Sequence, residues 1–287
     1  MDNADQALLL ARRYIDIEQP ARALETLDKL SNAPMQNPDY WYLRGRALYE
    51  LTRYEEAINM LQRGLGQRPD YTPLLYMMCN CQDNTGNLAE AERAILAALR
   101  LAPEEPAFLC RYAYLVAKAG QMDKADRLVD EAARISPQDP MVLHARASLS
   151  LLRGNDKEAA SHSREMLAKD PDNPVGHYMY GLSQYNSGKV SNAARHFGTA
   201  VRYDPKDQDT ARIARQSRIA SHWLLWPLRP LYKLGAAYAW IAAISTVFVL
   251  CIIGQYRIAG YVCKIYLVFC LYSWIMPPIL RWWYRQR

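Results

Sequence analysis

The sequence contains none of the common motifs that carry catalysis. It has no Gly-rich phosphate loop, no His-Glu-x-x-His pair and no Gly-x-Ser-x-Gly elbow. Its five histidines are scattered along the chain: His144, His162, His177, His196 and His222. His177 takes the place that Trp41 has in the second unit of a repeating pattern, which favours a structural role. We therefore predict that the protein is not an enzyme, and we predict no catalytic residue, cofactor, metal or small-molecule substrate.

The cysteines show no disulfide-like pairing. The six cysteines are Cys79, Cys81, Cys110, Cys251, Cys263 and Cys270. Cys79 and Cys81 have no His-rich cluster beside them, so small buried residues are expected there rather than a metal site. Free thiols of this kind are typical of a reducing compartment. The polar start of the chain also predicts no signal peptide.

Acidic residues are missing from the last part of the chain. All 29 of them lie at or before Asp209, where 25 Lys and Arg accompany them and leave a net charge of −4. From Ala211 onward there are ten basic residues and no acidic one, a charge of +10. The formal charge of +6 therefore combines a mildly acidic segment with a basic, apolar one. This distribution argues against nucleic acid as a partner.

One regular pattern stands beside these absences, a period of 34 residues. An alanine recurs at this interval, and in five units a proline follows it after twelve residues: Ala23, Ala57, Ala91, Ala125, Ala159 and Ala193, with Pro69, Pro103, Pro137, Pro171 and Pro205. In the first unit Pro34 falls one place early. A fixed period of this size is typical of repeat proteins.

Each unit has two apolar stripes at helical spacing with a breaker between them. A glycine tolerant of positive φ marks the turn in four units: Gly86, Gly120, Gly154 and Gly188. Thr52 replaces it in the second unit, so we expect that turn to differ slightly. Small residues stand where the two helices of a unit would cross, because only they allow backbones to come close: Ala11, Gly45, Cys79, Ala113, Ala147 and Gly181.

This pattern resembles the tetratricopeptide repeat. The family's marker residues are present as Trp41, Gly45, Tyr54, Ala57 and Pro69, and again as Gly181, Gly188, Ala193, Phe197, Ala200 and Pro205. Arg44 departs from the pattern, since the family usually has an apolar residue there. The resemblance covers residues 4–205 and implies an all-α, right-handed superhelical solenoid of six units (4–37, 38–71, 72–105, 106–139, 140–173 and 174–205), followed by a solvating helix at 206–222.

Two apolar stretches follow the repeats. Residues 235–254 are twenty residues without a charge, and a helix of that length spans roughly 30 Å, the thickness of the hydrocarbon core of a bilayer. A second stretch contains Lys264 near its start and two prolines, Pro277 and Pro278, near its end. We predict transmembrane helices at 234–254 and 258–280 that form a hairpin, a basic aromatic linker at 223–233 and a basic cytoplasmic tail at 281–287. The alternatives are a buried soluble hairpin and a second stretch that lies flat in the membrane interface.

Basic residues flank the outer ends of this predicted hairpin: Arg212, Arg215, Arg218, Arg229 and Lys233 before it, and Arg281, Arg285 and Arg287 after it. The connecting turn carries only Arg257, with Lys264 able to snorkel to the same surface. The positive-inside rule then places the repeats and the C-terminus in the cytoplasm. A bacterial inner membrane suits this arrangement.

The resemblance also implies a binding surface. In this family the first helix of each unit lines a concave groove, at its second, fifth, ninth, twelfth and thirteenth places. Carried onto this sequence, these places give a groove rich in tyrosine with mixed charges: Tyr42, Arg46, Tyr49, Tyr76, Asn80, Tyr114, Lys118, Tyr178 and Tyr185. Tyrosine has a rigid apolar ring with one polar tip and suits an extended or helical peptide. The alternative is that tyrosine is simply frequent at these places.

These observations predict a membrane-attached scaffold or adaptor that holds a protein segment in its groove and brings it to a membrane assembly. The alternative is an accessory subunit of a transport, secretion or polysaccharide-export complex in which the hairpin makes the essential contact. A carboxylate clamp like that of the chaperone-tail-binding members is not indicated, because Arg111 alone fits its pattern.

Overall fold

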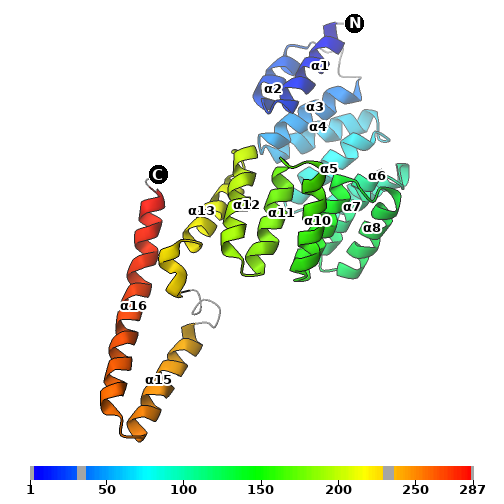
Figure 1. Ribbon diagram of the computed structural model, residues 1–287. Coiled ribbons are helices and arrows are strands. Elements are labelled where there is room, and N and C mark those ends of the chain that lie inside the picture. The colour runs from blue at the N-terminus through cyan, green and yellow to red at the C-terminus, as the bar shows by residue number, and fades with distance from the viewer. Residues whose placement is uncertain (1–2, 31–36, 229–235, 286–287) are drawn as a thin grey trace. The chain divides into compact units, whose positions relative to one another are not determined.

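The computed structural model describes residues 3–30, 37–228 and 236–285, and within these residues the chain is helical without β-strands (Figure 1). The chain divides into two compact units, residues 1–152 and 153–287, and the boundary falls inside the fifth predicted repeat. Pro34, residues 229–233 of the predicted linker, the first two residues of the first predicted span and Arg287 lie outside the described residues.

The first unit is a row of antiparallel helix pairs. These are α1 (Asn3–Asp16) with α2 (Pro20–Asp28), α3 (Pro38–Glu50) with α4 (Tyr54–Gln67), α5 (Thr72–Asn84) with α6 (Leu88–Leu101) and α7 (Pro106–Lys118) with α8 (Met122–Ile135), followed by α9 (Pro140–Leu152). The first helices of successive pairs also meet, since α1 contacts α3, α3 contacts α5 and α7 contacts α9. A wall of first helices is the arrangement that the repeat pattern predicts.

The turns inside the repeats share one hydrogen-bond pattern. In the third unit Gly86 has a φ of 84° and donates from its N–H to the Asp83 carbonyl, while the next residue bonds back to Gln82. The expectation that the Thr52 turn differs is wrong. Thr52 adopts a φ of 59° and makes the same pair of bonds, because the closure of the turn dictates the backbone there. Glu18, with a φ of 56°, takes this place in the first unit.

Helix crossings bury the small residues of the pattern. The recurring alanines from Ala23 to Ala193 are fully buried. A Cβ added to Gly45 would lie 2.6 Å from the Leu61 side chain, and one added to Gly181 would lie 2.7 Å from Phe197. Arg44, which departs from the family pattern, instead forms an ion pair with Asp28 of the preceding unit at 2.7 Å. The predicted crossing points are therefore confirmed at both glycines.

The second unit continues the pattern with α10 (Asp156–Lys169), α11 (Pro174–Asn186), α12 (Val190–Tyr203) and α13 (Gln208–Ala220). Side chains cap several of these helices: Asn155 accepts from the Glu158 N–H, and Asp207 accepts from the Thr210 N–H at 3.0 Å. Because an N-cap satisfies backbone donors that have no helical partner, Asp207 fixes where α13 begins. The helix α13 lies within residues 206–222, where the resemblance implies a solvating helix.

Two apolar helices end the second unit. After a short 3₁₀ helix, η2 (Trp223–Leu228), α15 (Ala236–Ile252) and α16 (Tyr256–Arg285) pack as an antiparallel hairpin around a turn in which Gly254 has a φ of 78°. Among the described residues one segment, Tyr256–Leu280, is long and apolar enough to cross a membrane. Its most apolar stretch of 18 residues has a mean hydropathy of 1.6, and only 6% of that stretch is buried.

The ends of α16 differ from the prediction. The helix begins at Tyr256 and runs through Pro277 and Pro278 to Arg285, so most of the stretch predicted as a tail is helical. The residue before a proline is only disfavoured, not forbidden, in the helical region, and adjacent helical packing tolerates the missing N–H. The helices α15 and α16 form a hairpin. Among the described residues, however, only one helix is long and apolar enough to cross a membrane, so the predicted hairpin with two spans is not supported.

Candidate functional site

A groove of about 570 Å³ lies in the first unit between α5, α7, α8 and α9. We call it the α5–α9 groove, and it is lined by Tyr76, Cys110, Arg111, Ala113, Tyr114, Ala117, Lys118, Val129, Met141, His144, Ala145, Ser148, Leu149 and Leu152. Its walls are mainly apolar, with a few polar groups among them. Its size and composition are typical of a ligand-binding site.

The apolar part of the groove is open to solvent. Tyr114 exposes 50%, Met141 40% and Leu152 68% of its surface. Large apolar side chains gathered at one concave surface mark an interaction site more strongly than the same residues scattered singly. Tyr76 closes the α5 side, where its ring stacks on Phe108 with the centroids 5.5 Å apart. The groove therefore combines a rigid aromatic wall with exposed apolar side chains.

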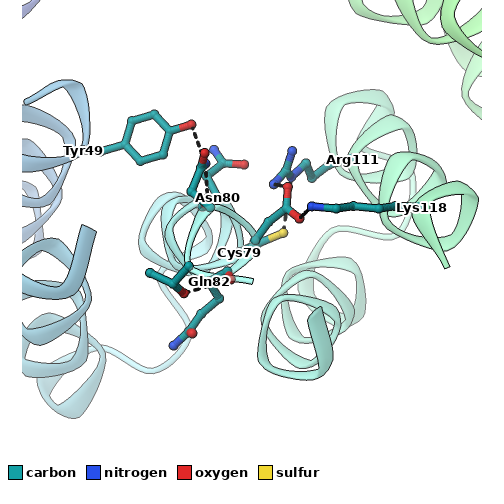
Figure 2. A network of polar contacts seen from close by, with 9 residues as sticks. Tyr49, Cys79, Asn80, Gln82, Arg111 and Lys118 are labelled. Atoms are coloured by element: carbon teal, nitrogen blue, oxygen red, sulfur yellow. Dashed lines mark hydrogen bonds and ion pairs between the residues drawn. The ribbon is translucent and has the colours of Figure 1, made fainter. Parts of the chain in front are cut away.

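The polar part of the groove is organised by a buried carboxylate. Asp83 of α5 accepts from Arg111 Nη2 at 2.9 Å and from Lys118 Nζ at 2.8 Å, both on α7. Arg111 also donates from Nε to the Cys79 sulfur at 3.4 Å, and Figure 2 shows both cations converging on this point of α5. Because a carboxylate accepts from both cations, Asp83 holds each of them in one direction.

The cations keep the capacity to meet a ligand. The hydrogen bond with Asp83 raises the pKa of Lys118, so this amine stays charged at neutral pH. The Arg111 guanidinium lies 5.2 Å from the centre of the Tyr114 ring, a cation–π distance. Two positive groups facing one carboxylate leave this end of the groove with a net positive charge.

His144 is the titratable group on the opposite wall. Its side chain lines the groove and is exposed there, and partial desolvation by the surrounding protein lowers its pKa below the ordinary value. Its Nε2 lies 3.5 Å from the Ser148 hydroxyl one turn later on α9. At neutral pH the imidazole is therefore uncharged and can donate or accept a hydrogen bond.

The predicted groove residues separate into groups. Tyr76, Tyr114 and Lys118 line the α5–α9 groove. Tyr49 and Asn80 lie next to it, linked through Asn84, whose amide donates to the Tyr49 hydroxyl at 3.1 Å and to the Asn80 carbonyl at 2.9 Å (Figure 2). Burial raises the pKa of Tyr49, so its hydroxyl stays protonated.

The remaining predicted residues lie outside this groove. Arg46 is held by Asp16 at 3.2 Å and by Glu50 at 3.3 Å, and Tyr42 packs against the core of the first unit. Tyr178 and Tyr185 are on α11 of the second unit. Tyr178 lies against Phe197 and lines a hollow of about 80 Å³.

Sequence reasoning left out Arg111, Met141 and Leu152. Met141 and Leu152 stand at the second and thirteenth places of the fifth predicted unit. Both places belong to the family's groove positions, so the family pattern is a signal that indicates these two residues. Arg111 occupies the sixth place, and its role depends on a pairing with Asp83 across two units. No periodic signal marks that pairing.

The cysteines give no sign of a metal site. Cys81 is buried, and burial raises its pKa to about 12, as it does for Cys110. Metal ligation requires the thiolate, which such burial disfavours. Within the described ranges no three His, Cys, Asp or Glu side chains come together in a way that suits a metal ion.

Comparison with known proteins identifies the class of this fold. Models of the tetratricopeptide repeat match residues 48–108 and 83–140, and a model of the anaphase-promoting complex, cyclosome, subunit 3, matches residues 1–64. Among curated proteins no sequence matches. The fold is thus that of a repeat solenoid, a class that typically serves as a protein-interaction scaffold. The matched residues carry tetratricopeptide repeats, and the fold is that of a tetratricopeptide repeat solenoid.

Solved structures with the same fold include TTC0263, a tetratricopeptide repeat protein of Thermus thermophilus, with 20% identity and a TM-score of 0.58 over 64% of this chain and 99% of that one. PilW, a type IV pilus biogenesis factor, has 15% identity and a TM-score of 0.58 over 74% and 99% of the two chains. A human IFIT1 dimer with m7Gppp-AAAA has 18% identity and a TM-score of 0.58 over 74% and 55%. At these identities the likeness concerns the fold alone.

Proposed function

We propose that this protein is a membrane-attached adaptor whose α5–α9 groove binds a segment of a protein partner. The observation that carries the proposal is the groove itself, in which Tyr114, Met141 and Leu152 expose apolar surface beside two cations oriented by Asp83. Apolar side chains supply the driving force for peptide binding, and fixed polar groups supply its register.

Attachment to the membrane rests on α16 and on the exposed apolar surface of the hairpin. Side chains such as Phe248, Ile252, Ile265 and Leu267 are exposed on both helices. Their exposure to water would be costly, whereas lipid would cover them. If the antiparallel helices α15 and α16 both cross the membrane, their outer ends lie on one side of it, and the basic residues near these ends support a cytoplasmic position for the repeats and the C-terminus. We propose that the protein is attached to a bacterial inner membrane.

Site-specific photo-crosslinking tests the groove. A benzoylphenylalanine at Met141, introduced into the full chain in its native membrane, is expected to capture a partner that the same residue at Leu101 does not capture. Leu101 is the matched control because it is similarly exposed but outside the groove. The double variant Tyr114→Ala, Leu152→Ala should abolish the Met141 product. Identical products from both positions would remove the groove from the proposal.

The second candidate is a subunit whose hairpin makes the essential contact inside the membrane, as in a transport, secretion or polysaccharide-export complex. Exposed side chains on both helices of the hairpin favour it, since they would also suit packing against other membrane helices. Replacing 236–285 with an unrelated two-helix hairpin separates the candidates. An adaptor would keep its function with the substitute, and a subunit of this second kind would lose it while remaining in the membrane.

A further inference from the structure

The last helix does not stand apart from the helical segment that precedes the hairpin. One stripe of α16, formed by Phe269, Tyr272, Met276 and Leu280, packs against Ile219 of α13 and against Leu224 and Leu225 of η2. Leu225 and Leu280 are buried in this contact. The Tyr272 hydroxyl donates to the Leu224 carbonyl, which adds a directed bond to the apolar packing. The end of α13 is therefore tied to α16.

This contact lies at a defined height along α16. At 1.5 Å per residue, Phe269 is about 20 Å and Leu280 about 36 Å from the start of the helix at Tyr256. The hydrocarbon core of a bilayer is about 30 Å thick. If Tyr256 marks one membrane surface, as the proposed function requires, the stripe crosses the level of the other surface. Trp223 and Trp274, both exposed near this level, suit the aromatic belt of an interface.

The C-terminal half of α13 is basic and unpaired. Arg215 and Arg218 are exposed, and neither forms an ion pair within the described part of the chain. Arg212, one turn earlier, differs because Asp209 holds it at 2.7 Å. Beyond Asp209 the sequence has no acidic residue that would compensate these charges.

We propose that Arg215 and Arg218 form a binding site for the headgroups of anionic lipids, with η2 as its apolar base in the interface. The occupant follows from charge and position: two unpaired guanidinium groups held at the level where phosphate groups of lipids lie. A guanidinium donates to phosphate oxygens in a bidentate manner, so arginine suits this ligand particularly well. The helix that follows the repeats, α13, is thereby held at the membrane surface. This inference rests on the proposed membrane attachment.

Lipid selectivity of the full chain tests the site. Protein in detergent micelles is titrated with dioleoylphosphatidylglycerol or dioleoylphosphatidylcholine, and the bound lipids are counted by native mass spectrometry. Each arginine near a headgroup should contribute about fivefold in affinity for the anionic lipid. The variant Arg215→Gln, Arg218→Gln should lose about 25-fold of that preference, and Arg215→Lys, Arg218→Lys should keep most of it. Arg212→Gln is the matched control and should change the preference by less than about twofold, because Asp209 already compensates its charge.

Two results would overturn the inference: equal retention of both lipids by the unaltered protein, or an unchanged preference in the double glutamine variant. Circular dichroism of that variant excludes loss of fold as the cause of its effect. Insertion of the unaltered chain into vesicles of phosphatidylcholine alone, followed by alkaline extraction, tests the attachment separately. Extraction of the protein would end the proposed membrane attachment and this inference with it, whereas stable insertion without lipid selectivity would end only the inference.

Discussion

Arg111 Nη2 lies 2.9 Å from Asp83 Oδ2, and this contact joins two successive repeats through side chains 28 residues apart. Asp83 exposes 7% of its side chain and Arg111 17%, so the pair is largely shielded from water. Lys118, which shares the carboxylate, is 43% exposed. The same carboxylate thus links α5 to α7 and directs the two cations in the α5–α9 groove.

The first prediction concerns this carboxylate. Asp83→Ala should lower the free energy of unfolding by about 3 kcal/mol, because it leaves Arg111 largely buried and without its compensating charge. Lys118→Ala should cost less than about 1 kcal/mol, since Lys118 is partly solvated and Asp83 keeps Arg111. Urea denaturation followed by circular dichroism gives both values. Equal losses in the two variants would show that the burial of Arg111 is not the decisive factor.

The second prediction concerns the turns that lack glycine. Thr52→Gly and Glu18→Gly should each stabilise the protein by about 1 kcal/mol, because both residues have a positive φ that costs an L-residue about 1–2 kcal/mol. The gain is reduced by the larger entropy of glycine in the unfolded chain. Thermal unfolding measures the change.

Gly86→Ala supplies the reverse experiment at the same place in the next repeat. Its added Cβ would meet no atom within 4 Å, so any loss of stability comes from the backbone conformation alone. A loss of about 1 kcal/mol is expected. If Gly86→Ala were neutral, the positive φ would not be the source of strain, and the argument for Thr52 would fail as well.

The third prediction is a pH dependence in the second unit. His196 of α12 lies with its Nδ1 3.0 Å from Nδ1 of His177, and the ring packs edge-on against Tyr180. Burial first, then His177 and Arg195, lowers the pKa of His196 in the folded state. Protonation is therefore easier in the unfolded chain, which binds more protons than the folded one as the pH falls below about 6.5.

The sign follows from this difference. The neutral imidazole stabilises the fold above the unfolded pKa, and that contribution is lost as the pH falls through the folded pKa. The free energy of unfolding should decrease between about pH 7.5 and 5.5, by at most about 1.4 kcal/mol per pH unit for one proton. His196→Gln, which removes the titration, should flatten this dependence in urea denaturation at a series of pH values. An unchanged slope in that variant would assign the pH dependence to other groups.

The sequence predicts the repeats well because their information is local and periodic. Ala57 is fully buried, and Gly45 meets Leu61 at the predicted crossing, since both depend only on the geometry within one unit. The pairing of Asp83 with Arg111 and Lys118 spans 28 and 35 residues, and neither interval is the repeat period. It depends on how successive helices rotate against one another, which no single-unit pattern contains.

The hairpin shows the same division. The apolar stretches are readable from composition, because a run of apolar residues is a local feature. The turn is predicted at 255–257, whereas it includes Gly254 with its positive φ, and α16 already begins at Tyr256. The continuation of α16 to Arg285 through two prolines is not readable from composition. It accompanies the packing of Tyr272 and Leu280 on η2, a contact between segments about fifty residues apart.

The last prediction concerns that contact. Tyr272→Phe removes the hydroxyl that donates to the Leu224 carbonyl and keeps the ring in the apolar stripe. A single hydrogen bond contributes about 1 kcal/mol, so opening of η2 and the end of α13 from α16 should become about fivefold more frequent. Hydrogen exchange of the full chain in detergent, followed by mass spectrometry, should show faster exchange at 219–225 and no change in α11 or α12. Tyr261→Phe is the matched control, because Tyr261 is an exposed tyrosine on the same helix outside the contact. Equal exchange in the two variants would mean that apolar packing alone holds α16 to η2, and that the carbonyl of Leu224 finds another donor.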